Sequence, residues 1–338
     1  MKNILIIRRD NIGDLVCTTP LIEGVKKAYP HANIYLLINS VSQDVIKNNP
    51  FIYRTYIYKK AKHRAKNQTA LGVYLERAKI FLKLRSVRFD AAILANPTPC
   101  KYSLRMAKLA GVKNIIGADS GGQGLTKAFT EADFSGKHQV EKTFSYLSAI
   151  TNENISIPKV NVFPEEHELA DARSRCAALL PQAKRVYGVH ISSRSPKRRW
   201  SPENYAEIIQ RLTEDKDAGV LIFWSPQGTL SPDDIGDRVR ADRLMELCAG
   251  RQVALYPTRS IRELIGGFAQ CETILCSDGG QMHLASALHK NLVVLFGDTD
   301  IDAWHPWSGK YQILQTPSGE CMDVTVDDVW QSFIAVEK

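Results

Sequence analysis

The stretch "IIRRDNIGDLVCTTP" (residues 6–20) decides how the chain begins to fold. It overlaps the end of an apolar run, residues 3–8, whose length is typical of a buried strand. A dinucleotide site in such a strand-to-helix turn usually carries several glycines, but this turn has one, Gly13, followed by an acid, Asp14. The motif G-x-G-x-x-G follows the first strand of neither half, which disfavours a nicotinamide dehydrogenase.

Two roles are open for Asp14. Gly13 lets the backbone turn tightly or approach a ligand closely. Asp14 falls near the start of the next helix, where it can cap the helix or act as a general base toward an acceptor hydroxyl. The two roles are in tension, because a helix N-terminus stabilises the ionised form of a carboxylate.

Strand-like and helix-like patterns alternate along the first half of the chain. The expected strands are residues 3–8, 33–38 and 90–95, and the expected helices are residues 18–29, 42–48, 69–86, 101–110 and 138–150. This alternation predicts a parallel sheet covered on both faces.

A polar segment with two prolines, residues 151–165, interrupts the alternation and is interpreted as a linker. The pattern then restarts, with strands at 186–191, 219–224, 272–276 and 291–296 and helices at 202–214, 259–269, 279–289 and 325–336. Two α/β lobes of similar size usually bind their ligand at the carboxyl ends of the strands, between the lobes.

The bulk composition narrows the function further. The 338 residues are 44% hydrophobic and 24% charged, which is ordinary for a globular protein with a large core. The net charge of +8 favours anionic partners such as nucleotides, phosphorylated glycans or a membrane surface, and no nucleic-acid motif is present.

Targeting and metal-binding signals are weak. No apolar run approaches the roughly 18–20 residues of a membrane span, and the first residues are too quickly charged for a signal peptide, so we expect a cytoplasmic protein. Seven scattered cysteines and the spacing of the histidines favour neither structural zinc nor metal dependence.

The stretch "HISSRSPKRRWSPENY" (residues 190–205) concentrates cations and hydroxyls between a strand end and a helix start. The helix has Ser201 as its expected N-cap and Pro202 at its first position. Lysine, arginine and serine side chains in such a loop suit a diphosphate, although a solvated basic loop is the alternative. The candidate residues are Ser192, Ser193, Arg194, Lys197 and Arg198.

Two further stretches carry candidate binding residues. In "LCSDGGQMHLASALHKNLVVLFGDTD" (residues 275–300), paired glycines expose backbone N–H groups at a helix start, and Asp278 can accept from sugar hydroxyls or cap the helix. His283 in the same helix is a motif residue or a core histidine. The basic run "YKKAKHRAKNQ" (residues 58–68) is either a solvated loop or a contact for an anionic acceptor or membrane.

Together, "IIRRDNIGDLVCTTPLIEGVKKAYP", "KRRWSPENYAEII" and "SDGGQMHLASALHKNLVVLFGDTDIDAWHPW" resemble glycosyltransferase family 9, the ADP-heptose:lipopolysaccharide heptosyltransferases. The resemblance implies an α/β GT-B fold, with two Rossmann-like domains facing a cleft. Residues 1–160 would form the acceptor-side domain and residues 161–324 the nucleotide-sugar domain, with the C-terminal helix, residues 325–338, packing back on the first.

The resemblance also implies chemistry: an inverting, metal-independent transfer of heptose from ADP-heptose to a lipopolysaccharide core acceptor, without a cofactor. It assigns Asp14 as the base and matches Lys197 or Arg198 to a lysine before a tryptophan. The implied donor-binding residues are Ser192, Ser193, Arg194, Lys197, Arg198, Asp278, Gly279, Gly280, Gln281 and His283, and the implied acceptor-binding residues, partly by position, are Gly13, Lys60, Lys62 and Arg64.

Two departures from the family pattern bear on the donor. Gly279 stands where the family more often has serine or threonine, and Asp298 in "GDTD" (residues 297–300) stands in place of a proline. A family member using another nucleotide sugar for capsule or another surface glycan is therefore an alternative, as is a non-catalytic protein that binds nucleotide sugars or glycans. The expected location is the cytoplasm, with peripheral contact at the inner face of the membrane.

Overall fold

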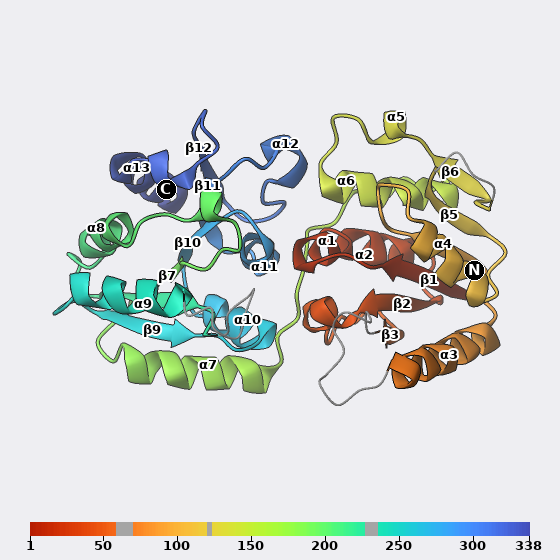
Figure 1. The fold of residues 1–338 in the computed structure, drawn as a ribbon, viewed down its shortest axis with the longest axis horizontal. Coiled ribbons are helices and arrows are strands. Elements are labelled where there is room, and N and C mark those ends of the chain that lie inside the picture. The colour runs from red at the N-terminus through yellow and green to blue at the C-terminus, as the bar shows by residue number, and fades with distance from the viewer. Residues whose placement is uncertain (59–69, 120–123, 227–235) are drawn as a thin grey trace. The chain divides into compact units, whose positions relative to one another are not determined.

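The computed structural model describes residues 1–58, 70–119, 124–226 and 236–338 (Figure 1). The chain divides into two compact units, residues 1–160 and residues 161–338. Each unit contains one six-stranded sheet with helices packed around it. No helix in the described part of the chain is both long and apolar enough to cross a lipid bilayer.

The sheet of the first unit is parallel throughout, in the order β3-β2-β1-β4-β5-β6. Its strands are β1 (Asn3–Arg8), β2 (Asn33–Asn39), β3 (Arg54–Tyr58), β4 (Ala91–Leu94), β5 (Ile115–Ala118) and β6 (Lys127–Phe129). Central strands such as β1 are buried along almost their whole length, because helices cover both faces. The three strands expected from the sequence are β1, β2 and β4.

The helices of the first unit differ from the expected ones in four places, since the short helices α1 and α5 were not expected and two expected helices have another form. They are α1 (Ile12–Val16), α2 (Thr19–Ala28), α3 (Ala70–Val87), α4 (Lys101–Leu109), α5 (Glu131–Phe134) and α6 (Gln139–Phe144). The expected helix at 42–48 is instead a 3-10 helix, Ser40–Val45, which the Asn39 side chain caps by accepting from the Val41 N–H at 2.8 Å. The expected helix at 138–150 divides into α6 and a 3-10 helix, Ser145–Ala149.

The second unit repeats the same topology, with the order β12-β11-β10-β7-β8-β9 and parallel pairing. Its strands are β7 (Arg185–His190), β8 (Ala218–Trp224), β9 (Val253–Pro257), β10 (Thr273–Ser277), β11 (Asn291–Phe296) and β12 (Tyr311–Gln315). In both units the first strand lies in the middle of the sheet.

The helices of the second unit include three that the sequence did not predict, α7, α9 and the short α12. They are α7 (Glu166–Leu179), α8 (Pro202–Leu212), α9 (Gly236–Leu247), α10 (Ile261–Ala269), α11 (Gly280–Ala287), α12 (Ile301–Trp304) and α13 (Val326–Glu337), with 3-10 helices at Pro196–Arg198 (η4) and Cys321–Asp323 (η5). The predicted start of α8 is confirmed: Ser201 Oγ accepts from the Asn204 N–H at 3.0 Å, and Pro202 is the first helical residue.

The C-terminal helix corrects one expectation. The segment 325–338 was expected to pack back on the first domain, but α13 packs against β11, β12 and α8 of the second unit. Its side chains Val329, Phe333 and Val336 are buried in the core of that unit. An amphipathic pattern predicts a helix with one apolar face, but it does not say which sheet will cover that face.

The strand order reverses at one point in each sheet, between β1 and β4 in the first unit and between β7 and β10 in the second. Loops leaving the carboxyl ends of such a strand pair run in opposite directions, and open α/β sheets bind their ligands there. The loops after β1, β4, β7 and β10 are therefore the places to examine for a functional site.

Candidate active site

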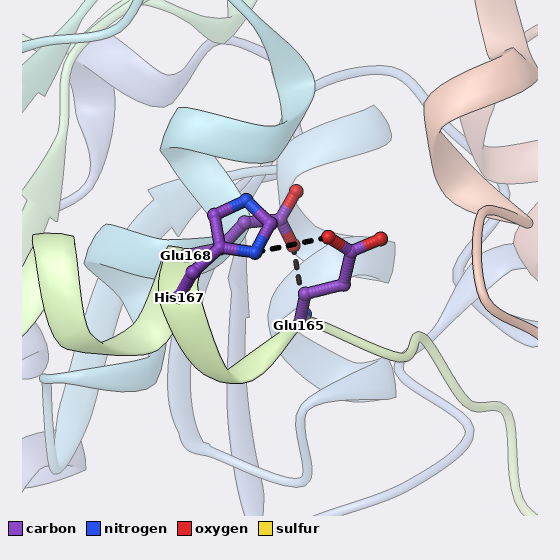
Figure 2. Close-up of side chains that lie close together, drawn as sticks. All are labelled: Glu165, His167 and Glu168. Carbon is purple, nitrogen blue, oxygen red and sulfur yellow. Dashed lines mark hydrogen bonds and ion pairs between the residues drawn. The ribbon is translucent and has the colours of Figure 1, made fainter.

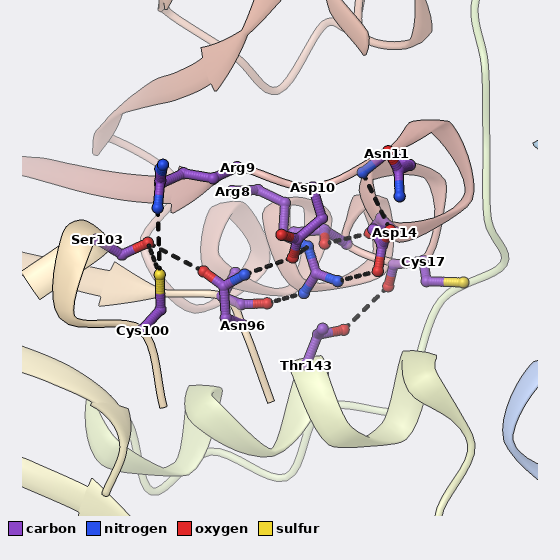
Figure 3. A network of polar contacts seen from close by, with 12 residues as sticks. Arg8, Arg9, Asp10, Asn11, Asp14, Cys17, Asn96, Cys100, Ser103 and Thr143 are labelled. Atoms are coloured by element: carbon purple, nitrogen blue, oxygen red, sulfur yellow. Dashed lines mark hydrogen bonds and ion pairs between the residues drawn. The ribbon is translucent and has the colours of Figure 1, made fainter. Parts of the chain in front are cut away.

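A buried arginine organises the loop after β1 (Figure 3). Arg8 is the last residue of β1 and is only 2% exposed. Its Nη2 donates to Asp14 Oδ1 at 2.6 Å, and its Nη1 donates to the carbonyl oxygen of Ala95. Its Nε lies 3.3 Å from Asp10 Oδ2, an ion-pair contact without hydrogen-bond geometry. One guanidinium thus holds two carboxylates and the end of β4.

Asp14 has a cap role, although it is not the N-cap residue itself. Asn11 is the N-cap of α1, and Asp14 is the third helical residue, whose Oδ2 accepts from the Asn11 backbone N–H at 3.1 Å. The other carboxylate oxygen, Oδ1, accepts from Arg8. Both contacts involve an ionised group and fix its orientation, while 18% of the side chain stays exposed.

Asp10 connects the loop after β1 to the loop after β4. Asn96 Nδ2 donates to Asp10 Oδ2, and the carbonyl oxygen of Asn96 accepts from the Tyr146 hydroxyl at 2.6 Å. From β2, Asn39 Nδ2 donates to the backbone oxygens of Arg9 and Asp10 at 2.6 and 2.7 Å. Asp10 is 38% exposed, so a second carboxylate lies near Asp14 and reaches solvent.

The same network extends to a cysteine at the start of α4. Arg9 donates through Nε to the Tyr58 hydroxyl at 2.8 Å and through Nη1 to Cys100 Sγ at 3.4 Å. Burial by itself would raise the pKa of Cys100, but hydrogen bonds from Ser103 and Arg9 outweigh it, and the pKa is lowered. Ser103 Oγ lies 3.2 Å from the sulfur and 3.1 Å from Asn96 Oδ1.

The acceptor-side residues proposed from the sequence have different outcomes. Gly13 lies inside α1, and its carbonyl oxygen accepts from the Cys17 N–H at 2.9 Å. It is not among the positive-φ glycines, so the expected tight turn at this position was wrong. Lys60, Lys62 and Arg64 lie outside the described residues.

In the second unit, the first three of the expected donor-binding residues lie between β7 and η4. Ser192 Oγ accepts from the Ser225 N–H at 2.9 Å, which joins this loop to the end of β8. The carbonyl oxygen of Ser193 accepts from Arg199 Nε at 3.0 Å. Arg194 is exposed and forms no ion pair with any residue that the structure describes.

Asp278, directly after β10, is the centre of a second polar cluster. It is 2% exposed and accepts from the Thr299 hydroxyl and from the Gly297 N–H at 3.3 Å. Arg198 Nε lies 3.2 Å from Asp278 Oδ2, and Arg198 Nη2 donates to Thr299 Oγ1 at 2.9 Å. Burial raises the pKa of Asp278, while Thr299, Arg198 and Gly297 oppose that rise. The carboxylate therefore fixes Arg198 and the loop after β11.

Lys197 and Arg198, either of which could match the lysine of the family motif, have different partners. Arg198 pairs with the buried Asp278, whereas Lys197 Nζ lies 3.3 Å from Asp298 Oδ2 and 4.0 Å from Glu320 Oε1. A hydrogen bond from Lys197 lowers the pKa of Asp298. The residue that departs from the family pattern thus neutralises a cation of the basic loop.

The glycine pair begins α11, as the sequence predicts. Gly279, the N-cap, has φ 148°, and a Cβ there would lie 2.9 Å from the Gln281 side chain, so the position requires glycine. Gly280 is the first helical residue, and Gln281 Nε2 donates back to the carbonyl oxygen of Ser277 at 2.9 Å. His283 is buried, with its ring 5.7 Å from that of Trp304, a core contact.

One group of potential metal ligands occurs in the described part of the chain: Glu165, His167 and Glu168 (Figure 2). Glu168 caps the start of α7 by accepting from the Glu165 N–H at 2.8 Å, and it also pairs with Arg262, which donates from Nε at 2.8 Å. His167 Nδ1 lies 3.0 Å from Glu165 Oε2. The charge of Glu168 is already compensated by Arg262, so these contacts explain the group as a helix start.

Several residues of these networks were missed from the sequence: Arg8, Arg9, Asp10, Asn39, Asn96, Cys100, Ser103 and Thr299. A usable signal existed, since Asn39 and Asn96 each directly follow a predicted strand run. In a parallel sheet such positions share one edge, so polar residues there are candidates for a common network. The identity of their partners could not be read from the sequence.

The fold and the two polar networks define a GT-B-type protein. A glycosyl transferase family 9 structure from Veillonella parvula matches with a TM-score of 0.84 at 16% identity, covering 99% of this chain and 97% of that one. The structure of Escherichia coli ADP-heptose LPS heptosyltransferase II matches with a TM-score of 0.75 at 21% identity, covering 99% and 98%. At these identities the structural matches establish the fold.

The chain belongs to glycosyltransferase family 9 (heptosyltransferase), whose family model matches residues 77–329. Lipooligosaccharide heptosyltransferase 2 of Haemophilus influenzae is 24% identical over 341 residues, covering 96% of this chain and 92% of the relative. Lipopolysaccharide heptosyltransferase 3 of Escherichia coli is 24% identical over 329 residues, covering 94% and 89%. The family resemblance is therefore confirmed, and the chain is a glycosyltransferase.

Proposed function

We propose that this glycosyltransferase moves heptose from ADP-heptose to a lipopolysaccharide core acceptor, with inversion at the anomeric carbon and without a metal ion. The observation that carries the proposal is Asp14, a carboxylate fixed by Arg8 and by the start of α1 at the carboxyl end of β1. The names of the relatives, which are lipopolysaccharide and lipooligosaccharide heptosyltransferases, support the substrate class. An Escherichia coli heptosyltransferase was solved with ADP-2-deoxy-2-fluoro heptose, which supports the donor class.

In the proposed mechanism, Asp14 accepts the proton of the attacking hydroxyl. The hydroxyl oxygen forms a bond to the anomeric carbon while the bond from that carbon to the diphosphate oxygen breaks. The electron pair leaves with ADP, and the sugar configuration inverts in this single displacement.

The second unit supplies the charge that the leaving group needs. Arg194, Lys197 and Arg198 are the proposed partners of the diphosphate, and they replace the stabilisation that a metal ion would give. Asp278 holds Arg198 in place through its 3.2 Å contact. Ser192, Ser193 and the start of α11 at Gly279 and Gly280 complete the proposed donor site, together with Gln281 and His283 of the same helix.

A second candidate is a family member with a different nucleotide sugar. Asp298 favours this second candidate, because it is an acid at a position where the family has proline, and it pairs with Lys197. A panel of nucleotide sugars, scored by nucleoside diphosphate release with a lipopolysaccharide core acceptor, decides between the two donors. Anomeric NMR of the product and turnover in EDTA test inversion and metal independence.

The role of Asp14 is tested by Asp14→Asn, which keeps an oxygen to accept from the Asn11 N–H but loses the basic group. We expect kcat to fall by about 100-fold or more, with donor affinity measured by calorimetry unchanged. Asn11→Ala is the matched control, because it weakens the same helix start and leaves the carboxylate; its kcat should stay within a few-fold of wild type. Equal losses in both variants would contradict the base role and favour a structural one.

A further inference from the structure

The outward surface of α3 and α4 has an unusual charge pattern. Both helices cover the same side of the first-unit sheet, where Leu84 and Ala107 are buried in one core cluster (Figure 1). We call residues 78–88 and 101–113 the α3–α4 face. The α3–α4 face contains no Asp or Glu, and eight cations, all exposed, lie on it: Lys79, Lys83, Arg85, Arg88, Lys101, Arg105, Lys108 and Lys113.

Among the residues that the structure describes, these cations have no ion-pair partners. This contrasts with α8, where Arg211 pairs with Glu207 at 2.6 Å and with Asp327 at 2.8 Å. Eight cations on adjoining helices, without ion-pair partners among the described residues, create a positive field that attracts an anionic surface.

Large apolar side chains stand among the cations. Leu82 is 70% exposed, Tyr102 57% and Leu109 46%. A soluble polyanion would meet only the charges, whereas an anionic bilayer takes both the cations at its headgroups and the apolar side chains at the acyl boundary. The combination therefore favours a lipid surface over a nucleic acid or a free glycan.

The α3–α4 face also adjoins the network around Asp14. The guanidinium of Arg9 lies 5.0 Å from the ring centroid of Tyr102, and Arg9 is next to Asp10 in the chain. We propose that the α3–α4 face docks this enzyme on an anionic lipid membrane. A lipid-anchored acceptor would then be presented beside the loop after β1, but docking itself does not depend on the proposed reaction.

Sedimentation with lipid vesicles tests the proposal. Wild-type protein should sediment with vesicles of phosphatidylcholine and phosphatidylglycerol, not with phosphatidylcholine alone, and high salt should release it. Arg105→Glu/Lys108→Glu should lower the vesicle-bound fraction by about tenfold or more. Leu82→Asn should lower it by about fivefold even in low salt, because it removes the apolar contact without changing the charge.

A matched control separates the α3–α4 face from net charge. Arg173→Glu/Lys310→Glu makes the same charge change at two exposed positions of the second unit and should bind like wild type. Equal loss in this control, or wild-type binding that ignores lipid charge, would overturn the proposal. The proposal would also be overturned if Arg105→Glu/Lys108→Glu abolished binding to a short DNA duplex but left vesicle binding intact. Thermal unfolding confirms that each variant is folded, and none of these readouts requires turnover.

Discussion

Arg8 is the residue on which both acids of the β1 loop depend. Its guanidinium is buried and contacts Asp14, Asp10 and the carbonyl oxygen of Ala95. Arg8→Met leaves two neighbouring carboxylates without their cation, which should lower the free energy of unfolding by about 2 kcal/mol, less than for a fully buried pair because Asp10 reaches solvent. It should also reduce kcat sharply, since Asp14 loses its orientation. Chemical denaturation and steady-state kinetics measure the two effects.

A double variant tests whether the lost stability comes from uncompensated charge. Arg8→Met/Asp10→Asn removes one of the two carboxylates left without a cation, so it should be more stable than Arg8→Met alone. Arg8→Lys keeps the charge but not the fork that reaches Asp14 and Ala95 together, so it should rescue part of the stability. Strictly additive losses in the double variant would contradict the coupling of Arg8 with Asp10.

At this scale the sequence predicted the type of residue better than its contacts. Asp14 was recognised as cap or base, and the structure shows the cap contact together with an ion pair. Arg8 and Asp10 are both part of the opening stretch, but a cation at the end of an apolar run is normally expected to lie at the surface. That Arg8 turns inward could not be inferred, because one of its partners, the carbonyl oxygen of Ala95, lies more than 80 residues away in the sequence.

At the scale of elements, one polar cluster ties the loop after β11 to η4. Asp278 and Thr299 hold Arg198, and Asp298 holds Lys197 at the surface. If Lys197 contacts the donor diphosphate, Asp298 competes with the donor for it. Asp298→Ala should therefore strengthen ADP-sugar binding by about two- to threefold at low salt, the modest size expected for exposed groups. Calorimetric titration at low and high salt measures the change.

Asp302→Ala is the control for this loop. It removes an equal charge four residues away on α12, where the side chain is exposed. Binding in this variant should match wild type, since Asp302 does not pair with Lys197. An equal gain in both variants would show a general effect of net charge, and an unchanged affinity in Asp298→Ala would remove Lys197 from the donor site.

The elements predicted from the sequence are those buried on both faces. Apolar runs identified β1, β2, β4, β7, β8, β10 and β11. The four edge strands were missed: β3 (RTYIY), β6 (KAF), β9 (VALYP) and β12 (YQILQ) are partly exposed, so they lack a continuous apolar run. The interior strand β5 (IIGA) was also missed, although it is buried, because only its first two residues are large and apolar. α13 was expected as a helix, but the sheet against which it packs was not predicted correctly. The choice of sheet depends on which of the two sheets has an uncovered face.

At the scale of the whole molecule, each unit has its own core. We therefore expect a buried titratable group to change the stability of its own unit when the pH changes. His190 ends β7 in the second unit and is buried, with its ring centroid 6.0 Å from that of Phe268. Burial lowers the pKa of His190 to about 4, and the charge of Arg240 acts in the same direction. In the folded state the imidazole therefore stays neutral until about pH 4, whereas in the unfolded state it binds a proton below about pH 6.5.

Neutral His190 is therefore fully compatible with the folded state above pH 6.5, and the free energy of unfolding decreases as the pH falls from 6.5 toward 4, because only the unfolded state binds the proton. Between pH 7.5 and pH 5, His190 should lower the free energy of unfolding of the second unit by about 2 kcal/mol. Hydrogen exchange at the two pH values should place the loss in residues 161–338. His190→Asn, which cannot titrate, should show a flatter pH dependence, and His31→Gln, at an exposed position of the first unit, should keep the wild-type slope. If His190→Asn loses as much stability as wild type on acidification, another group controls the response.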